Sequence, residues 1–118
     1  MNLTSRLTLA TCLAALALAG STASAYGSNS RACDPVVNPY AGSRYEGIDL
    51  TGVKANNVSC RKARRVAKKA HRKALGLAPS PDGFLEFRWR RWDVTGDLRP
   101  DSDRYVARRD GKRVRWRF

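Results

Sequence analysis

The clearest hydrophobic pattern in the chain lies between residues 57 and 76. Apolar residues recur there at the spacing of one helix face, at Ala63, Val66, Ala67, Ala70 and Ala74. Ser59 can cap the start of such a helix, and Gly76 can end it in the left-handed conformation. The pattern therefore predicts one amphipathic helix over residues 57–76. Because most of its apolar face is alanine, we expect a partner layer, formed by the aromatic-rich segment downstream, to pack closely against it.

Alternating apolar and polar residues predict strands on either side of this helix. Residues 48–53 fit a short strand with Ile48 and Leu50, and less clearly Val53, facing inward. Residues 84–92 fit a half-buried strand, since Leu85, Phe87 and Trp89 alternate with charged residues. The stretch 93–103 contains glycine, proline and four aspartates, which favours a polar loop.

The last stretch, residues 104–118, predicts a β-hairpin. Asp110-Gly111 suits a two-residue type I′ turn, and Val114, Trp116 and Phe118 alternate with arginines. Together these elements predict an α+β fold: one long basic amphipathic helix packed on a small three- or four-stranded, mainly antiparallel sheet that ends in a C-terminal β-hairpin.

The first 25 residues have the features of a secretory signal peptide. Arg6 precedes an apolar run over residues 7–20, and Ala23-Ser24-Ala25 forms a cleavage site. The run is short for a membrane span, so cleavage after Ala25 is favoured over an uncleaved anchor. We therefore expect a secreted or cell-envelope protein with no transmembrane segment after cleavage, a flexible N-terminus over residues 26–32 and one small domain over residues 33–118.

Two cysteines remain after cleavage, Cys33 and Cys60. An even number of cysteines in an exported chain favours a disulfide. Its loop would contribute about 3 kcal/mol to stability by the chain-entropy estimate. A zinc site would need further ligands, and His71 is the only histidine, so we expect no metal and no cofactor.

The start of the helix resembles a group of small exported actinobacterial proteins that have no assigned biochemical activity. Their pattern is Val-Ser-Cys-x-x-Ala-Arg-x-Val, matched here from Val58 to Val66. The group has two later cysteines, which this chain lacks in the segment Phe87-Arg88-Trp89 and at Ala107. The resemblance implies that those two form their own bridge in the relatives, leaving Cys33 paired with Cys60 here. It implies no functional residues.

Positive charge is the main indication of function. The chain carries a formal net charge of +13, and removal of Arg6 with the signal peptide leaves +12. The predicted helix has basic residues and no acid, and the arginines of the hairpin form a second basic surface that we expect on the opposite side. The candidate anion-binding residues are Arg61, Arg64, Arg65, Lys68, Lys69, Arg72 and Lys73 on the helix, and Arg113, Arg115 and Arg117 on the hairpin. A merely solvated face is the competing interpretation.

These features predict a non-enzymatic protein that binds anionic envelope polymers or extracellular polyanions. Nucleic acid is possible but not specifically indicated, because stacking needs an exposed aromatic and Trp92 is expected to pack over the strand end instead. We predict no catalytic residue: His71 is expected at the surface, without a partner that would make it a base. The alternatives are a protein-binding effector or inhibitor acting through residues 40–47 or 93–103 and, less favoured, a small hydrolase using His71.

Overall fold

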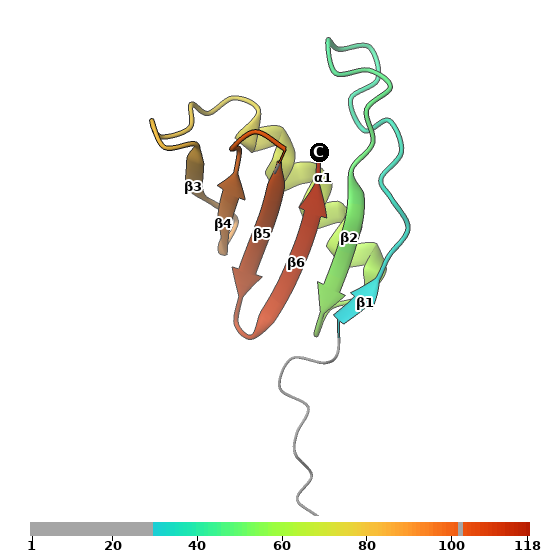
Figure 1. The fold of residues 1–118 in the computed structure, drawn as a ribbon. Helices are drawn as coiled ribbons and strands as arrows, with labels where there is room; N and C mark the ends of the chain where they lie inside the picture. Colours follow the sequence, from blue (N-terminus) through green and yellow to red (C-terminus); the bar gives the residue numbers. More distant parts are fainter. Residues whose placement is uncertain (1–29, 102) are drawn as a thin grey trace, which may run out of the picture.

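The computed structural model describes residues 30–101 and 103–118, which contain one helix and six strands. In chain order these are β1 (Ser30–Ala32), β2 (Thr51–Asn56), α1 (Cys60–Ala74), β3 (Phe84–Trp89), β4 (Trp92–Asp97), β5 (Arg104–Arg109) and β6 (Lys112–Arg117). The strands form one sheet in the order β1-β2-β6-β5-β4-β3, and every neighbouring pair is antiparallel. The helix lies across one face of this sheet (Figure 1).

The prediction of a long helix on a three- or four-stranded sheet is therefore wrong. The helix has 15 residues and the sheet six strands. One additional strand is β4, whose residues 93–97 lie in the stretch predicted to be a polar loop. The segment predicted as one strand over residues 84–92 therefore ends at Trp89, and the chain turns back at Trp92. The other additional strand is β1, formed by residues 30–32 of the expected flexible segment. The predicted signal peptide and residues 26–29 lie outside the described residues.

The helix has the predicted capping residue at its start, although it begins at Cys60 and not at residue 57, and it ends differently. The Ser59 hydroxyl accepts a hydrogen bond from the Lys62 amide at 3.2 Å, which satisfies a first-turn donor. Asn57 has a φ of 55°, so the helix cannot extend further toward the N-terminus. At the other end Leu75 is the capping residue, in a right-handed conformation. The prediction of a left-handed Gly76 is wrong.

The strand predicted at residues 48–53 is displaced along the chain. Leu50 and Val53 are buried, but Ile48 is 40% exposed, so its predicted inward position is wrong. Leu50 forms an isolated bridge with Val36 before β2 begins. The register of β2 against β6 shifts between Thr51 and Lys54, around Gly52 with its φ of 59°. This bulge explains why a simple alternation does not run through the whole segment.

The core lies between the helix and the sheet. Alanines of the helix are fully buried, which lets large side chains of the strands fill the space beneath it. Trp92 and Trp116 are the largest of these. The ring of Trp116 stacks on that of Tyr105, with centroids 5.4 Å apart and planes 4° from parallel. The sheet's opposite face consequently carries the alternate, polar residues.

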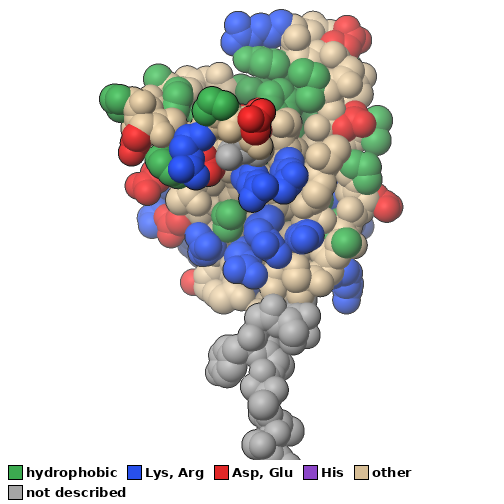
Figure 2. Space-filling view, viewed as in Figure 1, with side chains coloured by type: hydrophobic (Ala, Val, Ile, Leu, Met, Phe, Trp, Pro, Cys, Tyr) green, Lys and Arg blue, Asp and Glu red, His purple; other side chains and the backbone are tan. Residues whose placement is uncertain are grey.

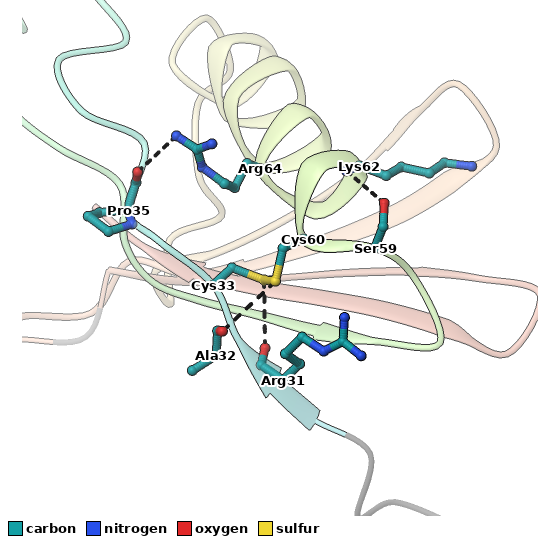
Figure 3. The surroundings of a disulfide bond; sticks show 8 residues. All are labelled: Arg31, Ala32, Cys33, Pro35, Ser59, Cys60, Lys62 and Arg64. Carbon is teal, nitrogen blue, oxygen red and sulfur yellow. Dashed lines mark hydrogen bonds between the residues drawn. A yellow bond between two sulfur atoms is a disulfide. The ribbon is translucent and has the colours of Figure 1, made fainter.

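The predicted disulfide is confirmed. Cys33 and Cys60 are bonded, with their Cα atoms 5.4 Å apart and 27 positions apart in sequence. Figure 3 shows that the bond ties the segment after β1 to the first residue of the helix. Within residues 30–101 and 103–118, no helix has the length and apolar character needed to cross a membrane.

Candidate anion-binding surfaces

Three neighbouring strands build a basic surface on the sheet face that the helix leaves open. Strands β2, β6 and β5 contain no aspartate or glutamate. Their register places Lys54 opposite Arg115, Arg108 opposite Arg113 and Arg104 opposite Arg117. The residues between them, such as Val114 and Trp116, face the helix, so the basic side chains face away from it. We call Lys54, Arg104, Arg108, Arg113, Arg115 and Arg117 the basic sheet face; Figure 2 shows this side of the molecule, where blue side chains gather.

The acidic residues of the sheet lie toward one edge, on β3 and β4. Asp93 pairs with Arg88 at 3.0 Å, and Asp97 pairs with Arg99 at 2.8 Å. The hydrogen bond from Arg99 holds the pKa of Asp97 below its ordinary value. Asp93 and Asp97 also lie opposite arginines of β5 in the register, so positive charge is least balanced over β2 and β6.

A shallow groove of about 480 Å³ lies on this basic sheet face. Its lining includes Lys54, Arg104, Arg115 and Arg117. The Arg115 guanidinium donates to the Ser30 hydroxyl at 3.2 Å, while its buried Nε has no partner among the described residues. Strand register thus brings together residues from three strands that the sequence pattern treated separately.

The outer face of α1 is the second basic surface. Most of its basic side chains are exposed, and Lys68 is half-buried. Two of them have structural contacts: Arg64 donates to the Pro35 carbonyl at 3.2 Å, shown in Figure 3, and Lys73 Nζ donates to the Arg88 carbonyl at 2.6 Å. Because the helix covers the other side of the sheet, this surface and the basic sheet face point in opposite directions.

A second groove, of about 420 Å³, lies between the start of α1 and the turn joining β3 to β4. Its lining includes Arg61, Lys62, Arg65, Trp89, Arg90 and Arg109. Trp89 is half-buried there, whereas Trp92 is only 2% exposed, in agreement with its predicted packing role. The sequence pattern did not identify this groove, because its residues come from separate segments that only the fold brings together.

His71 is in the core, so its predicted surface position is wrong. Its side chain is fully buried, and Nδ1 lies 2.6 Å from the hydroxyl of Tyr40. Burial lowers the pKa of the imidazole to about 4. Without exposed surface, His71 has no contact with solvent through which it could exchange protons with a substrate. Its position indicates a structural role.

The described residues contain no group of three or more His, Cys, Asp or Glu side chains arranged to hold a metal ion. Of the two loops predicted to contact a protein partner, residues 40–47 carry the buried Tyr40, and the stretch 93–103 begins with residues 93–97 of strand β4.

Comparison with known proteins found no matching family model, no similar curated protein and no similar solved structure. The resemblance of the helix start to exported actinobacterial proteins stays a prediction.

Proposed function

We propose that this protein is secreted, has no enzymatic activity and associates through its basic surfaces with anionic polymers of the cell envelope or the extracellular space. The observation that carries the proposal is the absence of acidic residues from four elements, α1, β2, β5 and β6, which hold most of the basic side chains.

Such an arrangement has an electrostatic cost. Like charges four residues apart on a helix destabilise it, and Arg61 with Arg65 is one such pair. Arginines directly opposite in a sheet repel in the same way, as Arg104 and Arg117 do. A polyanion lying on either surface would neutralise these charges and release its own counterions, so binding should weaken steeply as salt is added.

Charge reversal tests the proposal surface by surface. One variant carries Lys54→Glu, Arg113→Glu and Arg117→Glu on the basic sheet face, and another carries Arg65→Glu, Lys69→Glu and Arg72→Glu on the helix. We expect each to elute from an immobilised polyphosphate column at lower salt than the wild type. The matched control is Arg99→Gln, which removes a charge already paired with Asp97 and should leave elution unchanged. Binding that resists salt, or that neither triple variant weakens, would overturn the proposal.

A further inference from the structure

The groove between the start of α1 and the β3–β4 turn combines charge with an aromatic ring. Five of the nine residues that line it are basic, and Trp89 is one of the other four. Four of these basic residues make no ion pair among the described residues; Arg109 contacts Asp110 at 3.6 Å. The guanidinium carbon of Arg90 lies 5.4 Å from the centroid of the Trp89 ring, which keeps a positive charge beside an aromatic surface.

The turn beside this groove holds two arginines in a backbone conformation that is unfavourable for them. Arg90 and Arg91 have φ values of 49° and 64°, the left-handed region in which a residue with a Cβ costs about 1 kcal/mol relative to glycine. The other two-residue hairpin of the sheet, between β5 and β6, places Asp110 and Gly111 in the same region, as such turns prefer. Arg90 lines the groove, and the charge it brings there accounts for an arginine at a position that the turn itself does not favour, whereas Arg91 is outside the lining.

The Trp89 ring in the groove favours one class of polyanion over another. A chain of phosphates or carboxylates needs only positive charge. A single-stranded nucleic acid also offers unstacked bases, whose flat faces pack on aromatic side chains while its backbone lies against lysines and arginines. The groove volume, about 420 Å³, is within the range of sites that hold small ligands.

We propose that this groove binds single-stranded nucleic acid, with a base against Trp89 and phosphates against Arg61, Arg65 and Arg90. The inference rests on the proposed function, since it names the ligand class for one part of the basic surface. Stacking accepts every base, so recognition is tolerant of sequence. A duplex keeps its bases stacked inside and is expected to bind this groove less well.

The test compares the binding of two ligands by fluorescence anisotropy at fixed salt. A short labelled oligothymidylate is titrated directly, and inorganic polyphosphate is then used to displace it, which gives the affinity for polyphosphate. We expect Trp89→Ala to weaken oligothymidylate binding by about tenfold, the loss typical of one stacked base, while polyphosphate binding stays the same. Trp89→Phe should retain part of the affinity because it keeps a ring. Trp89→Leu, which keeps apolar bulk without a ring, should lose as much affinity as the alanine variant. If the alanine variant fails to fold, tighter binding by the phenylalanine variant than by the leucine variant still separates the effect of the ring from that of bulk.

The matched control is Phe84→Ala. Phe84 lies on the same strand as Trp89, is 39% exposed and has the Arg99 guanidinium carbon 4.9 Å from its ring centroid, but it is outside the groove. Its removal should leave both ligands unaffected. If the Trp89 and Phe84 variants bind both ligands as the wild type does, the nucleic-acid inference is wrong and the proposed function stands. If the wild type binds neither polyanion at low salt, both are wrong.

Discussion

The hydroxyl of Tyr40 lies 2.6 Å from Nδ1 of His71, inside the core. This contact joins the long segment before β2 to the helix. The same hydroxyl is 3.4 Å from the Lys68 carbonyl, and the rings of Tyr105 and Phe118 pack against the imidazole, with centroids 4.9 and 4.3 Å away. When the hydroxyl donates to Nδ1, the other ring nitrogen carries the proton, and this Nε2 has no partner among the described residues. The surroundings therefore favour the neutral imidazole.

We expect stability to depend on pH through this single histidine. Its pKa is about 4 in the folded protein because of burial, and about 6.5 in an unfolded chain. The unfolded state therefore binds the proton more tightly, so stability is complete above about pH 6.5 and falls by up to about 3 kcal/mol as the pH drops toward 4. Urea unfolding across this range measures the loss, and NMR gives the titration of the one imidazole. A His71 that titrates near pH 6.5 in the folded protein would contradict this.

Removing the Tyr40 hydroxyl should destabilise the protein at neutral pH. Tyr40→Phe leaves the buried Nδ1 without its partner, and an unsatisfied buried group costs about 1–3 kcal/mol. The control is Tyr45→Phe, whose hydroxyl accepts a hydrogen bond from Arg44 in an exposed setting and should change stability by less than about 0.5 kcal/mol. Denaturant unfolding of both variants gives the comparison. Equal effects would show that the hydroxyl–imidazole contact adds nothing.

Elements with strong local signals were predictable from the sequence. Ser59 caps the helix, and Asp110-Gly111 forms the turn of the last hairpin, because each depends on residues close in the chain. Strand β4 was not predictable. Gly96 resembles a loop residue, but in the fold a Cβ on it would lie 2.8 Å from a ring carbon of Tyr105. Glycine is needed there by a tertiary contact that local propensity does not reveal.

The candidate surfaces were likewise predictable only where they depend on residues close together in the sequence. The basic residues of the helix follow from its sequence, whereas Lys54 joins the sheet surface only because β2 pairs with β6 near the other end of the sequence. His71 was misplaced because its neighbours in sequence are basic. His71 lies four residues after Ala67, which places it on the apolar face of the helix. The helical spacing alone would therefore have predicted its burial.

Loss of the disulfide should lower stability without changing the basic surfaces. The bond between Cys33 and Cys60 restricts the unfolded chain, so the double variant Cys33→Ser and Cys60→Ser should lose about 3 kcal/mol. Urea unfolding measures the change. Intact mass before and after reduction provides the check on the bond itself, since both thiols should react with an alkylating agent only after reduction. Alkylation of either thiol in the unreduced protein would contradict the bond.

The β3–β4 turn offers a test in which stability and binding change in opposite directions. Replacing Arg90 by Asn and Arg91 by Gly supplies the residues that a type I′ turn prefers, so the free energy of unfolding should rise by about 1 kcal/mol. The same change removes two positive charges beside the groove, so affinity for oligothymidylate should fall. The reciprocal control, Asp110→Arg with Gly111→Arg, places arginines in the other hairpin turn and should destabilise the protein. If the Asn-Gly variant is more stable and binds as tightly as the wild type, the arginines at this turn have no role in binding. Binding would then depend on the other basic residues of the groove, Arg61, Lys62, Arg65 and Arg109.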